Sequence, residues 1–197
     1  MRVRPLLRGT VLAAAAAAVG YGALATDEGR RADAALFEAV NRGHGPEADR
    51  LFAGVTELGS LYAAGAAAGA LAALGRPPQA ARAIAAAGAT WLLGQAAKRA
   101  IARPRPAVAD PTGTRAMIAL PMGTSWPSIH PAVFTAFSVV AGRELGAGTV
   151  ARAGLTALGL SVAASRVYLG VHYPSDVVSG FLMGRAVAAV WPRIGRG

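Results

Sequence analysis

The sequence predicts an all-α integral membrane protein, built as one bundle of six helices. Hydrophobic residues make up 54% of the 197-residue chain, and its mean hydropathy is +0.41. Charged residues make up only 15%, against roughly 25% in an average soluble protein. Six apolar segments reach or approach the ~20 residues that a spanning helix needs. This composition indicates that apolar surface faces lipid as well as a core.

The six segments are expected to be the six helices, although their high alanine content makes several of them only weakly hydrophobic. They run from about residue 6 to 25, 52 to 74, 79 to 97, 131 to 145, 149 to 168 and 174 to 191. The chain length suits a single domain spanning residues 1–197. Residues 1–50 would supply the first helix and an outer loop, and residues 51–197 the functional core.

The first segment also allows a second interpretation. Three arginines, Arg2, Arg4 and Arg8, precede an apolar stretch that ends in the A-x-A pattern of residues 23–25, as in a cleaved signal peptide. The stretch is longer than the roughly 7–15 apolar residues usual in a signal peptide, and the rest of the chain is membrane-like too. We therefore favour a permanent helix and keep the signal peptide as the alternative.

Two further patterns concern the packing of the bundle. Leu36, Phe37 and Val40 recur at helical spacing within the polar loop after the first segment, which predicts a short helix lying on the membrane surface. The GxxxG pairs at residues 65–69 and 180–184 predict close contacts between helices of the same chain.

The arginines orient the segments, because cytoplasmic loops of membrane proteins carry an excess of basic residues. The residues assigned to the cytoplasmic side are Arg2, Arg4, Arg8, Arg76, Arg82, Arg143, Arg152, Arg193 and Arg196. The outer loops are then residues 26–51, 98–130 and 166–173.

Composition also excludes several classes of protein. The chain has no cysteine, which rules out disulfides, thiolate catalysis and cysteine metal sites. The net charge of +10 raises the question of nucleic-acid binding. However, the basic residues are scattered singly between apolar runs, whereas a nucleic-acid site needs a clustered stripe. We therefore expect a membrane, and no nucleic acid, as the partner.

Three polar stretches, residues 98–106, 125–131 and 165–176, fall on the same outer face in this topology. Arginines at a membrane edge are usually interfacial anchors, and we interpret Arg99 and Arg103 in this way. That interpretation does not explain why histidine and serine accompany the cations. Cations with His and Ser are typical of a phosphate oxyanion site. The candidate residues are Lys98, which is the only lysine of the chain, Arg105, Ser128, His130, Arg166, His172 and Asp176.

Proline places both histidines at helix starts. Pro131 follows His130, and Pro174 lies two residues after His172; proline suits the first turn of a helix. Free N–H groups and the helix dipole favour a bound anion there. Asp176 lies four residues after His172, so its carboxylate can accept from one imidazole nitrogen and leave the other nucleophilic.

These stretches resemble the signature of the type 2 phosphatidic acid phosphatase (PAP2) superfamily, KxxxxxxRP, PSGH and SRxxxxxHxxxD. Lys98 to Arg105-Pro106 matches the first motif, and Ser165-Arg166, His172 and Asp176 match the third. Pro127, Ser128 and His130 match the second, where Ile129 stands in place of the usual glycine. The resemblance covers the chain from about residue 50 to its C-terminus and includes the helix order. It implies a six-helix bundle of the PAP2 and haloperoxidase type.

The resemblance also implies a reaction and a role for each residue. Lys98, Arg105 and Arg166 would bind the phosphoryl oxygens, and Ser128 and the backbone N–H groups near Ile129 would add hydrogen bonds. His172, oriented by Asp176, would attack phosphorus, and His130 would protonate the leaving oxygen. Such enzymes are similar in needing no metal and no cofactor. A backbone donor remains at Ile129, but a β-branched residue there predicts an altered rate or substrate range.

The leading hypothesis is therefore a cell-membrane phosphatase with an extracytoplasmic site, acting on a lipid phosphate. Candidate substrates are polyprenyl phosphates or diphosphates, phosphatidic acid and phosphatidylglycerol phosphate. Alternatives are a phosphotransferase that uses the same site and a catalytically weakened or non-catalytic membrane protein that binds an anion. A vanadium haloperoxidase shares the motifs, but those proteins are soluble and larger. Outside the motifs, we expect His44 to be a solvated loop residue and Glu57 to support one of the arginines.

Overall fold

The computed structural model describes residues 3–192. Three of the arginines assigned to the cytoplasmic side lie outside the described residues, namely Arg2, Arg193 and Arg196. Within the described range all of the regular secondary structure is helical, with no strand. The helices are α1 (Val3–Ala25), α2 (Asp27–Val40), α3 (Pro46–Glu57), α4 (Leu61–Ala73), α5 (Pro77–Ala100), α6 (Pro106–Ala109), α7 (Ile129–Glu144), α8 (Thr149–Tyr168) and α9 (Pro174–Val190).

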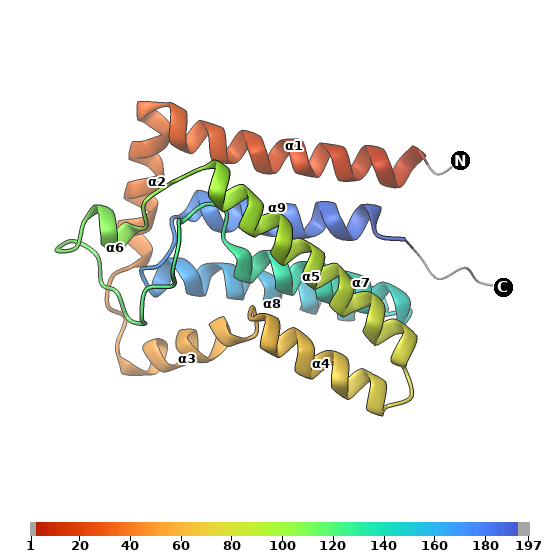
Figure 1. Cartoon of the computed structure of the whole chain (residues 1–197). Helices are drawn as coiled ribbons and strands as arrows, with labels where there is room; N and C mark the ends of the chain where they lie inside the picture. Colours follow the sequence, from red (N-terminus) through yellow and green to blue (C-terminus); the bar gives the residue numbers. More distant parts are fainter. Residues whose placement is uncertain (1–2, 193–197) are drawn as a thin grey trace.

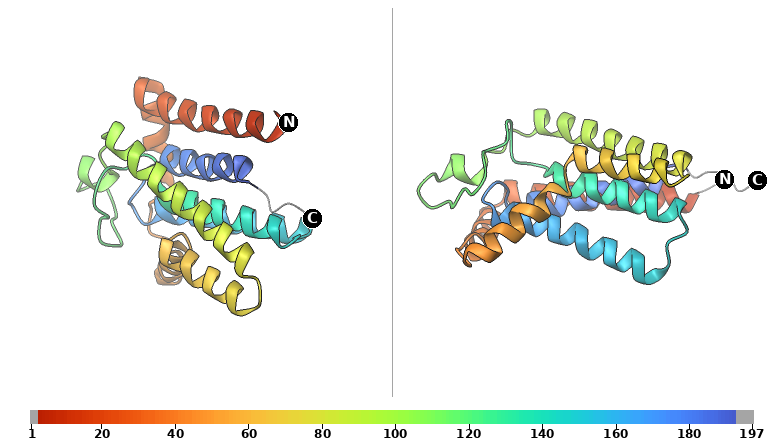
Figure 2. Two further views of the ribbon diagram at one scale, coloured as in Figure 1. Left: turned by 45° about the vertical axis from the view of Figure 1, so that its right-hand side comes forward. Right: turned by 90° about the horizontal axis from the view of Figure 1, so that it is seen from below.

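Helices α7 and α9 form the centre of the bundle. Helix α1 packs along α9, α5 packs along α7, and α8 contacts both central helices, while α4 lies against α5. Figures 1 and 2 show that the ends of the described chain lie at one end of the bundle, whereas α2, α3 and α6 gather at the other end. This second end carries the candidate active site.

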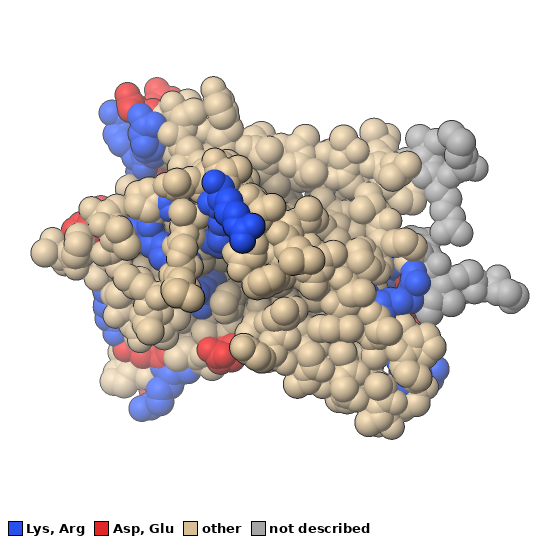
Figure 3. All heavy atoms as spheres, in the orientation of Figure 1, with Lys and Arg blue, Asp and Glu red and all other residues tan. Residues whose placement is uncertain are grey.

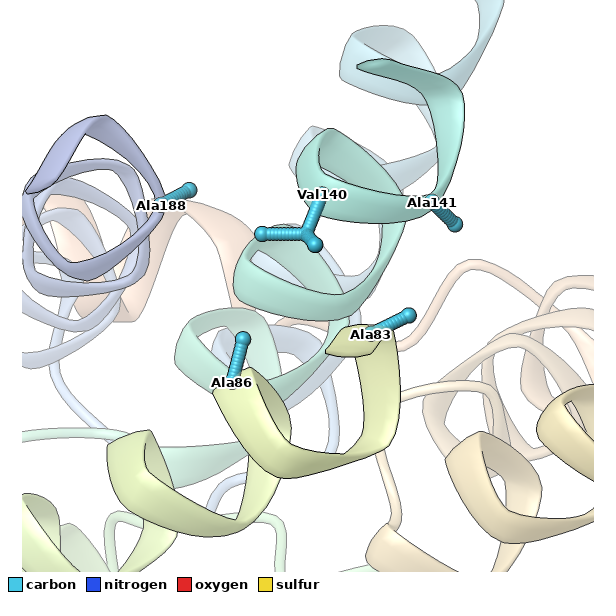
Figure 4. Close-up of a cluster of buried hydrophobic side chains, with 5 residues drawn as sticks. All are labelled: Ala83, Ala86, Val140, Ala141 and Ala188. Atoms are coloured by element: carbon cyan, nitrogen blue, oxygen red, sulfur yellow. The ribbon is translucent and has the colours of Figure 1, made fainter. Parts of the chain in front are cut away.

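Small side chains fill the interfaces between the long helices. Ala83 and Ala86 of α5, Val140 of α7 and Ala188 of α9 are buried in one cluster, in which their side chains point toward one another (Figure 4). Side chains this small let helix backbones approach closely, which is the main source of helix association in lipid. The alanine that weakened the hydropathy signal therefore serves the packing of the bundle.

The two GxxxG pairs differ in their surroundings. A Cβ atom on Gly180 would lie 2.0 Å from the carbonyl oxygen of Ser128, and one on Gly184 would lie 2.4 Å from that of Ala132. The prediction of close contact within the chain is thus confirmed for this pair. It is wrong for Gly65 and Gly69, whose Cβ atoms would meet nothing within 4 Å.

Five of the six predicted segments form single helices, and the second is broken. Helices α3 and α4 meet at a bend of 64°. The break follows from local chemistry, because Ser60 has extended backbone angles and its side chain accepts a hydrogen bond from the N–H of Ala63, which starts a new helix. The short helix predicted in the polar loop is present as α2, capped by Thr26.

The outer surface of the bundle exposes apolar side chains, although few of its helices are apolar enough on their own to pass as membrane spans. Of the described helices only α1 is long and apolar enough to span a membrane alone, and α3 with α4 passes only as a bent pair. Nevertheless, the outward faces of α5 and α8 expose Leu92, Leu93, Leu158 and Leu160. On the side that carries α4 and α5, Figure 3 shows charged atoms toward the two ends of the bundle and an uncharged band between them. A band of this kind is typical of the surface that a membrane protein presents to lipid.

Helix α1 is packed as a member of this bundle. The hydroxyl of Ser179 on α9 donates to the carbonyl oxygen of Ala16 at 3.0 Å. A Cβ atom on Gly9 would lie 2.4 Å from a methyl group of Val190. These contacts place α1 against α9 along the bundle.

Candidate active site

The imidazole of His172 lies at the centre of the site, in the connection between α8 and α9. It is buried, with 2% of its surface exposed. Arg105 Nη1 lies 3.2 Å from His172 Nε2. Because a guanidinium can only donate, Nε2 must be the accepting, unprotonated nitrogen, and the ring proton is assigned to Nδ1. This is the tautomer that a nitrogen nucleophile at Nε2 requires.

The Nδ1 side of the ring faces Asp176, and Ser125 lies beside both residues. His172 Nδ1 is 3.5 Å from Asp176 Oδ2 and 3.3 Å from Ser125 Oγ. Ser125 Oγ donates to the same Oδ2 atom. Each of the two contacts of the hydroxyl is shorter than the direct distance from the ring nitrogen to the carboxylate oxygen. Sequence reasoning missed Ser125, although it stands in the same polar stretch as Ser128.

The start of α9 holds the Asp176 carboxylate in place. The backbone N–H of Tyr173 donates to Oδ2 at 2.9 Å, which satisfies one of the free donors of the first helical turn. Burial lowers the pKa of His172 to about 3, against the opposing effect of Asp176. The neutral, nucleophilic form of the ring is thus present at physiological pH.

The interpretation of Arg103 as a membrane-edge anchor is wrong. Its side chain is buried, and Nη1 donates to Asp176 Oδ1 at 2.7 Å while Nη2 donates to Asp33 Oδ2 at 2.7 Å. The guanidinium also lies 4.0 Å from the ring centroid of Tyr173. Asp33 in turn accepts from the backbone N–H and the hydroxyl of Ser175. Arg103 thus joins the surface helix α2 to the carboxylate behind His172.

The three predicted phosphate-binding cations approach the site from different segments. Lys98, in the last turn of α5, donates from Nζ to the carbonyl oxygens of Thr124 and Ser125. Arg105 donates from Nη1 to the carbonyl oxygen of Val171 at 2.9 Å as well as to His172. Its Nε atom donates to the carbonyl oxygen of Gly123 at 3.1 Å. These bonds orient two cations toward the loop that carries the second motif.

Arg166, the third cation, is buried in α8, and its main partner comes from α3. Its Nη1 atom donates to Thr56 Oγ1 at 2.7 Å. The charge of the neighbouring Glu57 also acts on Arg166, so the expected support by Glu57 is electrostatic while Thr56 makes the contact. Sequence reasoning had not singled out Thr56.

The second motif forms the start of α7. Ser128 is its N-cap, and its backbone N–H donates to the carbonyl oxygen of Asp176 at 3.0 Å. His130 lies in the first turn, where the charges of Arg166, Arg105 and Lys98 all reach its ring. The backbone thus joins the starts of α7 and α9, and both catalytic histidine candidates share one field of positive charge.

Ile129 occupies the glycine position of the motif without the expected strain. No described residue other than glycine has a positive φ, so Ile129 has ordinary helical backbone. Its side chain packs in the apolar cluster of Ala87 and Val133, and a Cβ atom on Gly94 of α5 would lie 2.9 Å from it. The side chain is therefore directed into the bundle, toward α5.

Two buried polar atoms of this cluster have no hydrogen-bond partner among residues 3–192. They are Ser128 Oγ and Arg166 Nε. Native proteins rarely leave such groups unpaired, so each one needs an explanation. Cations and free donors around a neutral imidazole can bind a tetrahedral oxyanion and place its central atom beside Nε2.

His44, the third histidine, is exposed as expected and stacks on Tyr168 outside this cluster.

Comparison with known proteins places the chain in a family. The model of the PAP2 superfamily matches residues 79–196. The decaprenylphosphoryl-5-phosphoribose phosphatases of two Mycobacterium tuberculosis strains, CDC 1551 / Oshkosh and H37Rv, are each 35% identical to this chain over 100 residues. These residues are 51% of this chain and 52% of each relative. The match therefore spans about half the length of the curated relatives.

Two solved structures share the fold. A transmembrane PAP2-type phosphatidylglycerolphosphate phosphatase from Bacillus subtilis has a TM-score of 0.70 and 24% identity, with 95% of this chain and 93% of that chain covered. Aquifex aeolicus LpxE has a TM-score of 0.69 and 26% identity, with 78% of this chain and 90% of that chain covered. The family match covers more than half of the chain, including all three motifs, and the chain therefore belongs to the PAP2 superfamily.

Proposed function

We propose that the chain is a membrane phosphatase that hydrolyses a lipid-linked phosphate ester or diphosphate through a phosphohistidine intermediate. One observation carries the proposal. Arg105 donates to the unprotonated Nε2 atom of His172 at 3.2 Å, while Asp176 and Ser125 lie beside Nδ1. A phosphoryl oxygen that accepts from the same guanidinium brings its phosphorus within reach of Nε2.

In the first step, Nε2 of His172 attacks phosphorus on the side opposite the leaving oxygen. A nitrogen–phosphorus bond forms as the bond to the lipid oxygen breaks. His130, whose protonated form is favoured once the negative charge of the bound phosphate offsets the surrounding cations, donates its proton to that oxygen. Lys98, Arg105 and Arg166 stabilise the negative charge on the three equatorial oxygens of the transition state. The charge on Asp176 stabilises the cationic ring that forms.

In the second step, water attacks the phosphohistidine. The now neutral His130 accepts a proton from the water as the nitrogen–phosphorus bond breaks, and phosphate leaves. An alcohol in place of water would give a transferase, so the products should be compared with and without added alcohol. The three cations supply the charge that a metal ion provides in other phosphatases, and for this reason we expect activity without added metal.

The substrate class follows from the position of the site at the end of a membrane bundle. A phosphate group reaching it from the bilayer belongs to an amphiphile. The matching mycobacterial relatives are named for a phosphate on a polyprenyl-linked sugar. We therefore place phosphates carried by polyprenyl lipids first among the substrates, ahead of glycerolipid phosphates.

A phosphate-release assay on lipid phosphates tests the proposal. We expect the purified protein in detergent to release phosphate from at least one polyprenyl or glycerolipid phosphate. The rate should be unchanged by EDTA and should fall with vanadate, which mimics the five-coordinate transition state. A strict requirement for added Mg²⁺ would contradict the mechanism, and the absence of activity on the whole panel would favour the anion-binding alternative.

We further propose that the site faces the outside of the cell and that the long helices cross the membrane. The distribution of arginines supports this orientation. Because the chain has no cysteine, the single substitutions Ala116→Cys and Ala147→Cys report on the two ends of the bundle. A membrane-impermeant maleimide added to intact cells should label position 116 and leave position 147 unlabelled until the cells are opened. The reverse pattern would place the chemistry in the cytoplasm.

A further inference from the structure

Two adjoining cavities lie at the end of the bundle remote from His172, near the start of α1 and the end of α9. Their volumes are about 230 Å³ and 250 Å³. Four helices contribute to their walls, and both cavities share Arg8 of α1, Val139 and Arg143 of α7, and Arg185 of α9. Arg4 completes one cavity and Arg152 the other. Neither wall contains a described acidic residue.

Arg143 is already neutralised within the protein. It pairs with Glu144 at 2.9 Å and donates to the carbonyl oxygens of Ala188 and Trp191, closing the end of α9. Arg8 and Arg185 differ from it, because neither forms a hydrogen bond or an ion pair with any residue in the described part of the chain. The two free guanidinium groups line the same cavities, and the charge of each acts on the other.

Interfacial anchoring accounts for exposed arginines such as Arg4, Arg8 and Arg152, whose side chains can extend to the membrane surface. It does not account for Arg185. This side chain is half-buried, and it lies five residues before the end of α9, beside a second cation and without a counter-ion among the described residues. Such an arrangement costs free energy unless an anion offsets the charge.

We propose that these cavities bind a phosphate-bearing anion at a site separate from the catalytic one. Arg8 and Arg185 donate to the phosphate oxygens, as arginine does in other phosphate sites. Val139, Leu155 and Ala189 provide an apolar wall that fits the first methylenes of a lipid chain. Basic pockets between membrane helices are known to suit anionic headgroups. The volumes fit a headgroup and are smaller than the roughly 300–1,000 Å³ of a drug-sized site.

The test compares three proteins in nanodiscs. They are the wild type, the Arg8→Gln/Arg185→Gln variant, and an Arg31→Gln/Arg76→Gln control. The control also loses two charges, but its arginines are exposed and line neither cavity. Retained lipid is counted by native mass spectrometry, and Tm is measured in parallel. The arms are phosphatidylcholine alone, phosphatidylcholine with phosphatidylglycerol, and phosphatidylcholine with inorganic phosphate.

We expect the wild type and the control to retain phosphatidylglycerol over phosphatidylcholine by roughly tenfold or more, and the Arg8/Arg185 variant to lose this preference. Arg8→Lys/Arg185→Lys should restore part of it, which separates lost charge from lost folding. If inorganic phosphate alone raises the Tm of the wild type and control, but not of the variant, the natural ligand is free phosphate. Equal lipid retention and equal Tm shifts for all three proteins in every arm would overturn the proposal. Phosphate bound at the catalytic site does not disturb this comparison, because it contributes equally to each protein.

Discussion

Replacing His172 with alanine is expected to lower phosphate release from the best lipid substrate by at least about 10⁴-fold, because no other group can form the covalent intermediate. The imidazole is buried between Arg105 on one side and Ser125 and Asp176 on the other. Removing it leaves the cations in place, so binding of phosphate or vanadate should persist. Steady phosphate release by the His172→Ala protein at even one hundredth of the wild-type rate would exclude the phosphohistidine mechanism.

His130→Ala provides the complementary result. With a lipid alcohol as leaving group, loss of the general acid should cost about 10² to 10⁴-fold. With p-nitrophenyl phosphate, whose leaving group needs no proton, the first step should survive while the second slows. We therefore expect a burst of p-nitrophenol equal to the enzyme concentration, with an alkali-stable phosphoprotein accumulating. Equal losses on both substrates and no burst would remove His130 from the proton-transfer role.

His44→Ala is the matched control for both histidine variants. His44 is exposed and stacks on Tyr168 without contacting the catalytic cluster. Its replacement removes one imidazole from the protein and should leave kcat and KM within about twofold of the wild type, in line with most surface substitutions. A loss comparable to that of His130→Ala would show that the assay responds to something other than the proposed site.

The parts of this fold that could be predicted from sequence depend on local chemistry. The fifth segment was predicted at residues 149–168, and α8 spans the same residues, because Gly148 and the polar end of the segment mark clear boundaries. The three motifs likewise position their residues through short-range geometry. Pro174 starts α9, and the fourth-residue spacing from His172 to Asp176 then brings the two side chains to 3.5 Å.

The parts that could not be predicted depend on contacts between distant residues. Arg103 resembled any arginine at a membrane edge, and its partner Asp33 lies 70 positions away on a helix outside the motifs. Thr56 contacts Arg166 from 110 positions away. The break between α3 and α4 lies at residues 58–60, inside a segment that is apolar on both sides, and the capping of Ser60 reveals it. Hydropathy and spacing carry no information about such pairs.

Replacing Arg103 with glutamine is also expected to have a large effect, although Arg103 is a positioning residue and makes no contact with the substrate in the proposed mechanism. Its guanidinium lies between the carboxylates of Asp33 and Asp176, and all three side chains are buried. Without it, two buried carboxylates face each other uncompensated, and Asp176 would tend to take up a proton. A protonated Asp176 can no longer stabilise the charged ring of His172 in the transition state.

We expect kcat to fall about 10 to 100-fold, as for other groups that orient a catalytic residue, while KM changes by no more than about threefold. Loss of one partner from a buried ion pair also costs roughly 3–5 kcal/mol of stability, so Tm must be measured beside activity. Arg103→Lys keeps the charge, but a single ammonium cannot bind both carboxylates through separate nitrogens as the guanidinium does. This variant should therefore recover stability more than kcat. Arg99→Gln, four residues away and exposed, is the control and should resemble the wild type.

The division between kcat and KM separates this role from the alternatives. An arginine that bound the phosphoryl group would raise KM, or lower kcat and weaken vanadate inhibition together. One that acted only as a structural support would lower Tm without changing kcat in the protein that remains folded. A fall in kcat with unchanged vanadate affinity in folded Arg103→Lys is the result expected of a group that acts through Asp176. With such a result, Asp33 on helix α2 would join the machinery as well, because it holds the other end of the same guanidinium.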